Sequence, residues 1–228
     1  MELSTLQLVI IWVLPVLFAI TVHETAHGWV AFKRGDSTAY QLGRITLNPI
    51  KHIDMLGTVI LPTVMLMISN FVFGWAKPVP VNFHNLKNPR RDMALVALAG
   101  PGSNLLMAIF WAIVVQIGWL TFESFPLTIF LVYMGSAGIF INAILMVLNL
   151  LPILPLDGGR ILYSLLPTRL GTHYAKLEPF GLVILLILLI TGGLGYILLP
   201  PVLSTYFFAG GSFDILKLIF GKTIMVNG

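Results

Sequence analysis

Three ionisable side chains stand close together inside an otherwise apolar stretch near the start of the chain. Residues 17–32 read LFAITVHETAHGWVAF and include His23, Glu24 and His27. On a helix, histidines at positions i and i+4 share one face, so both imidazoles can reach one zinc ion. Glu24 directly follows the first histidine and can take a proton from a water that the metal activates. This H-E-x-x-H pattern predicts a zinc-dependent hydrolytic centre.

The surrounding composition is that of an integral membrane protein. Hydrophobic residues make up 57% of the 228 positions, charged residues only 10%, and the mean hydropathy is +0.95. The alternative reading is that the two histidines bond to backbone carbonyls and that Glu24 is a buried, protonated acid. Each of the three groups would then need its own partner, and ionisable residues inside a membrane are functional candidates by default. The composition therefore favours the metal site.

Several apolar runs are long enough to span a bilayer, which takes about 20 residues in a helix. Four runs are continuous, at 6–32, 94–120, 127–151 and 181–199. Two are less regular: 53–73 contains Pro62, and 202–220 is interrupted by AGGSFD. We expect an all-α, polytopic bundle of about five or six helices in one domain, 1–228, with a catalytic core at about 6–166 and C-terminal helices at about 174–222. The first run lacks a positive leader and a cleavage site, so we expect it to be retained.

The distribution of basic residues predicts the orientation in the membrane. Lysine and arginine gather in three loops, at 33–51, 77–91 and 160–176, whereas the turns 121–126 and 200–205 hold none. The positive-inside rule places all three basic loops in the cytoplasm. A full crossing by 53–73 would put the first two loops on opposite sides. We therefore predict a re-entrant segment that returns as the extended run GWAKPVPVN, with an ordinary span as the alternative.

A third metal ligand is expected, because catalytic zinc sites use three protein ligands and keep one position open. Most acidic residues outside the motif lie in loops beside basic ones. Asp157 differs, because it follows an apolar span within NLLPILPLDGGRIL. Pro152 and Pro155 interrupt the helix there, and two glycines after Asp157 permit a close approach of the backbone. With a re-entrant 53–73, Asp157 returns to the depth of the histidine pair.

These motifs resemble the site-2 protease family of intramembrane zinc metalloproteases. The resemblance rests on HETAH at 23–27 and LDGGR at 156–160, together with FGWAKPVPVN, NPRRDMALVALAGPGSN and NLLP between them. It covers about 21–166 and is greatest to the compact branch, since the chain has no room for a peptide-binding PDZ domain. It implies an intramembrane endopeptidase in a multi-pass cell-membrane protein. The orientation set by the basic loops has the active site opening toward the cytoplasm.

The resemblance also assigns residues. It implies that His23, His27 and Asp157 bind Zn²⁺ and that Glu24 is the general base. Asn149, eight positions before Asp157, matches an asparagine that holds the substrate backbone or the developing oxyanion. Asn104 is a further candidate for substrate binding, although the small residues around it also suit helix packing. The three other histidines, at 52, 84 and 173, look like loop or interfacial residues.

Other readings remain open at this stage. The same ligands could serve a membrane zinc transporter. A path for zinc through the membrane would, however, need polar groups along other spans as well. Another class of membrane H-E-x-x-H peptidase would use a glutamate as its third ligand, and an inactive relative would only bind helices. The expected partners are transmembrane protein substrates and the bilayer, with a homo-oligomer as an alternative. The net charge of +4 is explained by topology, so no nucleic acid is expected.

Overall fold

Long apolar helices account for most of the chain in the computed structural model, which describes residues 3–61, 63–64 and 74–220. No strand occurs among these residues. The principal helices are α1 (Thr5–Arg34), α2 (Thr38–Gln41), α4 (Pro89–Thr121), α5 (Ile129–Asn149), α6 (Asp157–Leu165), α7 (Thr168–Ala175), α8 (Gly181–Ile190), α9 (Gly193–Phe208) and α10 (Phe213–Phe220). Short turns of helix are η1 (Pro49–His52), η2 (Met55–Ile60), η3 (Phe83–Asn85), η4 (Pro126–Thr128) and η5 (Glu178–Phe180). The predicted all-α architecture is confirmed.

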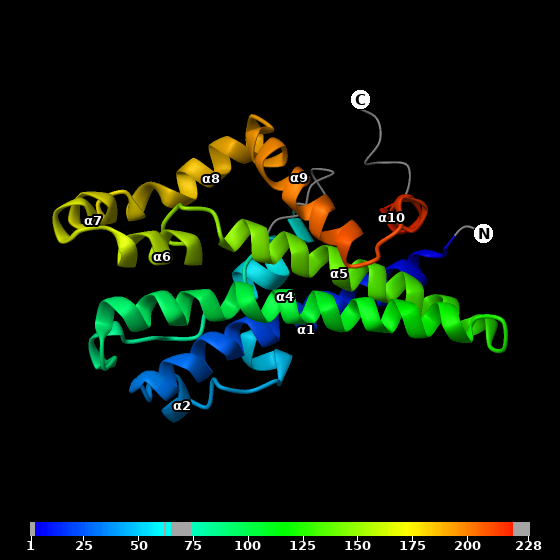
Figure 1. Cartoon of the computed structure of the whole chain (residues 1–228), viewed down its shortest axis with the longest axis horizontal. Helices are drawn as coiled ribbons and strands as arrows, with labels where there is room; N and C mark the ends of the chain where they lie inside the picture. Colours follow the sequence, from blue (N-terminus) through cyan, green and yellow to red (C-terminus); the bar gives the residue numbers. More distant parts are fainter. Residues whose placement is uncertain (1–2, 62, 65–73, 221–228) are drawn as a thin grey trace.

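The centre of the molecule is a bundle of α1, α4 and α5, which lie side by side in Figure 1. Glycines allow these helices to approach closely. A Cβ atom built on Gly138 of α5 would lie 2.3 Å from the indole ring of Trp111 in α4, and one on Gly135 would lie 3.0 Å from its carbonyl oxygen. Membrane helices associate through such small residues, because lipid provides no hydrophobic driving force between them.

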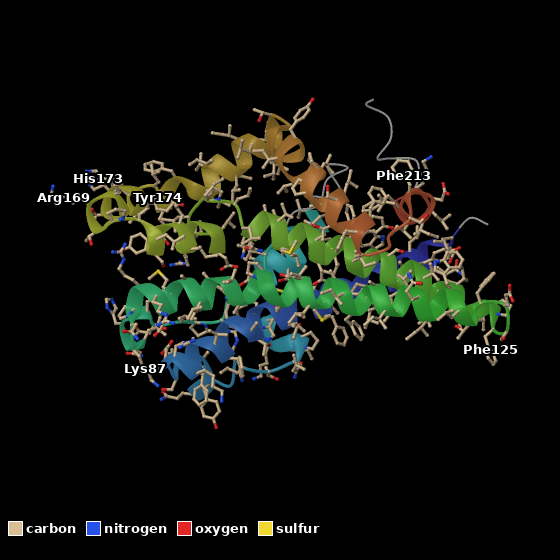
Figure 2. The ribbon with its side chains drawn as sticks, viewed as in Figure 1. Lys87, Phe125, Arg169, His173, Tyr174 and Phe213 are labelled. Carbon is tan, nitrogen blue, oxygen red and sulfur yellow. The ribbon has the colours of Figure 1, made fainter. Side chains whose placement is uncertain are left out.

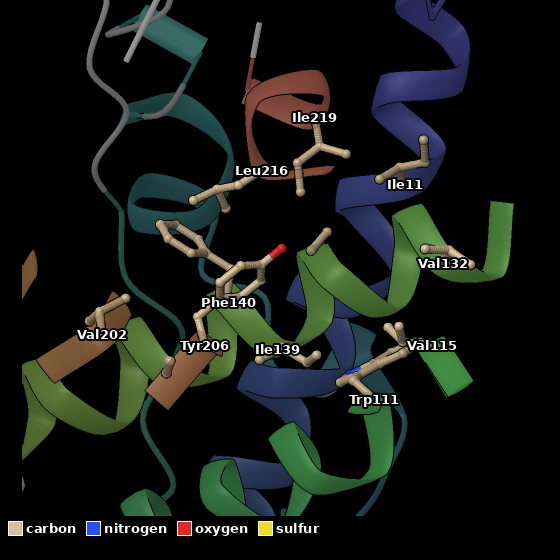
Figure 3. Packing of buried hydrophobic residues seen from close by; sticks show 12 residues of the cluster. Ile11, Trp111, Val115, Val132, Ile139, Phe140, Val202, Tyr206, Leu216 and Ile219 are labelled. Carbon is tan, nitrogen blue, oxygen red and sulfur yellow. The ribbon is translucent and has the colours of Figure 1, made fainter. Parts of the chain in front are cut away.

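The apolar core lies where α9 and α10 cover this bundle. Figure 3 shows Ile11, Trp111, Ile139, Phe140 and Tyr206 converging from four helices. The ring of Phe140 makes edge-to-face contacts with Trp12, Tyr206 and Phe220. These aromatic contacts join the C-terminal helices to α1 and α5.

The C-terminal helices correct one expectation. Residues 181–199 were expected to form a single span, but the helix ends at Ile190 and α9 begins at Gly193. The break occurs because Gly192 adopts a left-handed conformation, with φ of +76°, which glycine reaches without steric cost. The unit long enough to cross is instead Thr168–Ile190. The predicted interruption of 202–220 is confirmed, since α9 and α10 meet at a bend of 120°.

Among the described residues, four helical units are long and apolar enough to span a membrane, or five if α9 and α10 count as one broken span. Figure 2 shows Lys87 and Arg169 at one end of the long axis and Phe125 at the other. Two of the three basic loops, 77–91 and 160–176, therefore have labelled residues at the same end of the bundle, as topology set by positive charge requires.

The predicted re-entrant segment falls partly outside the described residues, which omit 62 and 65–73. Its two flanks can be compared. The Trp75 N–H donates to Gly57 O at 3.1 Å, and the Lys77 N–H donates to His52 O at 2.9 Å. The chain thus returns beside the point from which it departed, and residues 74–82 form neither helix nor strand, with Asn82 in an extended conformation.

Candidate metal centre

The histidine pair lies on one face of α1, as the spacing predicts. The two Nε2 atoms of His23 and His27 are 3.0 Å apart, and the rings stand nearly perpendicular to each other. Both side chains are largely buried where α1 packs against α4. A regular helix is thus sufficient to bring two nitrogen ligands together.

Asp157 reaches the same point from the other side. Helix α5 ends at Asn149, the following residues turn back, and α6 begins at Asp157 itself. The carboxylate Oδ2 lies 3.4 Å from His23 Nε2 and 3.3 Å from His27 Nε2. The glycines after Asp157 make this turn possible: a Cβ on Gly158 would lie 2.2 Å from Leu150 O, and one on Gly159 would lie 2.5 Å from Leu154 N.

The Nδ1 atoms of both imidazoles, which point away from Asp157, each lie within hydrogen-bond distance of an acceptor oxygen. His27 Nδ1 lies 2.7 Å from Val96 O, and His23 Nδ1 lies 2.6 Å from Asn104 Oδ1. The orientation of the Asn104 amide is fixed in turn, because its Nδ2 donates to Asn142 Oδ1, and Asn142 Nδ2 donates to Gly138 O. Nδ1 therefore carries the proton in each ring, and each Nε2 has a lone pair available.

Two nitrogen lone pairs and a carboxylate oxygen thus face one another. Asp157 Oδ2 is buried and has no hydrogen-bond donor among the described residues. Three acceptors that converge in a buried place repel one another unless a metal ion or a proton lies between them. Zinc–ligand bonds of about 2.05 Å in tetrahedral geometry place ligand atoms about 3.3 Å apart, close to the separations of 3.0, 3.3 and 3.4 Å found here. The donor set fits zinc, and it is the one such cluster within the part of the chain that the structure describes.

Gly100 of α4 leaves the space that the imidazoles fill. A Cβ at this position would lie 2.4 Å from His27 Nε2 and 2.5 Å from His23 Cε1. By contrast, a Cβ on Gly102, half a turn away, would meet nothing within 4 Å. The two glycines of AGPGS therefore differ: only Gly100 is required by the site.

Glu24 has a partner outside the metal cluster. Its Oε2 accepts a hydrogen bond of 2.7 Å from the backbone N–H of Val79. Val79 lies in residues 77–82, a segment outside any helix that we call the strap. The Val79 side chain is buried and packs against α1, since a Cβ on Gly28 would lie 2.9 Å from Val79 Cγ1.

The strap is held at its far end by Asp36, which is fully buried just after α1. Asp36 Oδ2 accepts from the Asn82 N–H at 2.7 Å, and Oδ1 accepts from Asn85 Nδ2 at 3.0 Å and from the N–H of Thr38. Burial alone would raise the pKa of Asp36, but the hydrogen bonds from Thr38, Asn85 and Asn82 outweigh burial and lower it. Asp36 is thus an ionised anchor.

The remaining candidates have different surroundings. The Asn104 amide is fully buried and both of its ends bond within the protein, which fits a partner of His23 rather than a contact with substrate. Asn149 lies at the end of α5 and donates one N–H to Leu145 O, so the role expected for it stays a prediction. His52 was expected at the interface but is only 2% exposed, with Nε2 at 2.9 Å from Thr46 O.

Sequence reasoning missed Asn142, Val96, Val79 and Asp36. A polar residue within the apolar run 127–151 could have singled out Asn142, because such residues in spans are costly. Val96 and Val79 act through backbone atoms, which leave no signal in side-chain identity. Asp36 looked like an ordinary loop acid beside basic residues.

The comparisons with known proteins agree with one another. The sequence profile of "Peptidase family M50" matches residues 123–192. The candidate zinc metalloprotease YwhC of Bacillus subtilis (strain 168) is 38% identical over 208 residues, which cover 90% of this chain and 89% of that protein. Candidate zinc metalloproteases named Rip2 are 28% identical over 194 residues in Mycolicibacterium smegmatis and 30% identical over 193 residues in Mycobacterium tuberculosis strain H37Rv, each covering 84% of this chain and 68% of the relative.

No solved structure matches the chain significantly. The family therefore rests on the sequence comparisons, of which the first spans nearly the whole of both proteins. The H-E-x-x-H helix, the convergent aspartate and the apolar spans are all present in the chain. The chain belongs to peptidase family M50, the site-2 protease family, and is a multi-pass membrane zinc metalloprotease.

Proposed function

We propose that this zinc metalloprotease is an intramembrane endopeptidase, which hydrolyses peptide bonds in or near the transmembrane segments of other membrane proteins. In this proposal His23, His27 and Asp157 hold the zinc ion and Glu24 is the general base. The observation that carries it is the convergence of three buried acceptor atoms with separations of 3.0 to 3.4 Å, two of which lie on a helix apolar enough to span the membrane.

When bound there, zinc would polarise the scissile carbonyl and acidify a water molecule. Glu24 takes the proton of the attacking water and later delivers it to the leaving amine. Asn104 and Val96 hold the two imidazoles in the tautomer that leaves Nε2 free. The second N–H of the Asn149 amide is available to bond the substrate backbone or the developing oxyanion.

The substrate must present an unwound segment to this site. Every amide of a transmembrane helix is bonded internally, so the helix has to open locally before hydrolysis. Helix-breaking residues near the cleaved bond lower the cost of opening. The proposed substrates are therefore transmembrane proteins with a locally unstable helix.

The proposed orientation has the active site opening toward the cytoplasm. Its support is the gathering of basic residues, such as Lys87 and Arg169, at one end of the bundle. We also propose that residues 1–228 form a single protease domain, in which α1, α4, α5 and α6 make the catalytic core and the later helices complete the bundle.

Two alternative functions use the same residues differently. A zinc transporter would need a route of polar groups through the spans, whereas the described residues hold one tight cluster of metal-ligating side chains. A peptidase with glutamate as third ligand is disfavoured by the approach of Asp157 Oδ2 to both imidazoles. Protease activity therefore accounts best for the arrangement.

The proposal is tested by comparing the wild-type protein with Glu24→Gln in cells and in liposomes. We expect membrane peptides to accumulate in cells with Glu24→Gln, and in liposomes we expect cleavage of a helical membrane substrate to fall about 10²- to 10⁴-fold, while the zinc content stays unchanged. Cleavage that persists in Glu24→Gln would contradict the role of the base. Zinc uptake into sealed liposomes without any peptide cleavage would favour the transporter.

A further inference from the structure

The strap, residues 77–82, passes directly beside the proposed general base. We propose that the backbone N–H of Val79 positions Glu24, by fixing one carboxylate oxygen so that the other faces the reacting water. This inference rests on the proposed role of Glu24 as the base. It assigns a positioning role to a residue whose side chain has no catalytic chemistry.

The contact itself has the properties of a positioning bond. The N–H of Val79 donates to Glu24 Oε2 over 2.7 Å, a short distance typical of a hydrogen bond to an ionised carboxylate. The Val79 side chain is buried against α1 near Gly28, so the peptide group cannot move away without leaving its packing place. One carboxylate oxygen is therefore held, and Oε1 remains available.

The sequence of the strap allows only one donor at this place. Pro78 and Pro80 flank Val79, and proline has no backbone N–H. A shift of the strap by one residue would place a proline against Glu24 and leave the carboxylate without its partner. The two prolines also favour an extended backbone before the strap meets α1. The alternation Pro-Val-Pro thus fixes which residue can contact the base.

Anchors on both sides of Val79 hold the strap in place. On one side, the Lys77 N–H donates to His52 O at 2.9 Å, and Arg44 Nη2 donates to Lys77 O at 2.9 Å. On the other side, the Asn82 N–H donates to Asp36 Oδ2 at 2.7 Å. The anchoring groups come from elements that pack around the end of α1, so the body of the protein sets the position of the Val79 N–H.

A substitution to proline removes this donor, and because it also replaces the side chain that packs against α1, KM and zinc content are measured alongside kcat. We expect Val79→Pro to lower kcat for a membrane substrate by about 10- to 100-fold, which corresponds to losing a hydrogen bond to a charged group. KM and zinc content should stay within about twofold of wild type. Val81→Pro is the matched control, since its N–H bonds to none of the described residues, and it should keep kcat within about threefold.

A spectroscopic measurement tests the contact without relying on activity. Labelling with ¹³C-carbonyl proline and ¹⁵N-valine selects only the amides of Val16, Val79, Val81 and Val202, which follow prolines in the sequence. In the wild-type protein, the Val79 amide proton should resonate downfield of the other three. In Glu24→Ala it should move upfield by at least several tenths of a ppm, while the Val81 amide stays in place.

The outcomes separate this inference from the proposed function. If Glu24→Gln abolishes cleavage but Val79→Pro leaves kcat unchanged, the base is correct and the positioning role is wrong. A Val79→Pro protein that cleaves faster than wild type would show that the strap covers the base and restrains it, which also overturns the inference. If the chemical shift of the Val79 amide proton is the same in Glu24→Ala as in the wild-type protein, the hydrogen bond between Val79 and Glu24 is not formed and the inference is wrong. Cleavage that survives Glu24→Gln would instead overturn the proposed function.

Discussion

The catalytic core and the C-terminal arm, which we define as α8, are both built from apolar sequences but bury very different shares of them. In the span Pro126–Asn149, half of the most apolar window is buried, whereas in Thr168–Ile190 only 6% is. The core also buries polar side chains, among them His23, Asn104 and Asn142. The difference indicates that polar bonds between helices determine the core, while the arm is an apolar surface suited to lipid.

The contrast has a physical basis in the membrane. An unpaired polar group is costly in hydrocarbon, so a buried chain of hydrogen bonds is stable only when every member is satisfied. The chain from Gly138 O through Asn142 and Asn104 to His23 links α5, α4 and α1 in this way. Substitutions in the core should therefore change zinc binding and catalysis, and those in the arm should change little.

The largest effect is expected for Asp157→Ala. Removing the only oxygen of the proposed ligand set leaves two nitrogen ligands, so the bound zinc should fall well below one ion per chain and cleavage should drop by at least about 10³-fold. Metal analysis of the purified protein and cleavage of a membrane substrate measure both. Asp214→Ala in α10 is the control and should match wild type. Full zinc content in Asp157→Ala would mean that another residue is the third ligand.

A smaller but still large effect is expected for Gly100→Ala. Its new Cβ would lie 2.4 Å from His27 Nε2, so an imidazole has to move and zinc affinity should fall by about 10- to 100-fold. Competition with a chelator measures this affinity. Gly102→Ala, on the same helix, meets nothing within 4 Å. It should bind zinc normally and gain up to about 1 kcal/mol of stability, because alanine is preferred to glycine within a helix.

Asn104→Leu and Asn149→Leu separate the two candidate asparagines. Losing the Asn104 amide leaves His23 Nδ1 without its acceptor, so zinc affinity should fall by about 10-fold, at the lower end of the effects seen for such partners. Asn149→Leu should keep its zinc and lower only the turnover number. If Asn104→Leu retains normal zinc affinity and loses turnover, Asn104 contacts the substrate instead.

The pH dependence of stability tests the anchor of the strap. The pKa of Asp36 is lowered in the folded protein. Its carboxylate therefore stabilises the fold at pH values above the ordinary aspartate pKa of about 3.9. This stabilisation is lost as the pH falls through the lowered pKa of the folded protein. At pH 6 we expect Asp36→Asn to be less stable than wild type by about 1 kcal/mol. The difference should shrink on acidification toward pH 3, as followed by unfolding in detergent. A difference that is independent of pH would indicate that packing, rather than charge, makes the anchor.

The sequence predicted those features that follow from residue type and spacing. The histidine pair on one helix face, the spans within 6–32, 94–120 and 127–151, and the return of Asp157 are present in the structure. What it could not show are contacts made by backbone atoms, such as Val79 N–H and Val96 O, because every residue carries the carbonyl and every residue except proline carries the N–H. The break at Gly192 was also missed, since an apolar run shows length but not where a glycine takes a left-handed conformation.

The smallest effect is expected in the arm, for Ile190→Ala. Ile190 is 84% exposed at the end of α8, where its side chain would contact lipid in both the folded protein and an unfolded but membrane-inserted chain. Its truncation should change the unfolding free energy by no more than about 0.5 kcal/mol. Ile139→Ala in α5 is the matched comparison: that side chain is fully buried, and the cavity left by its loss should cost about 2 kcal/mol or more. Unfolding of both variants in bicelles measures the difference.

Equal losses of unfolding free energy in the two variants would mean that α8 is covered by protein, most simply by a second copy of the chain. The arm would then be an interface rather than a lipid-facing surface.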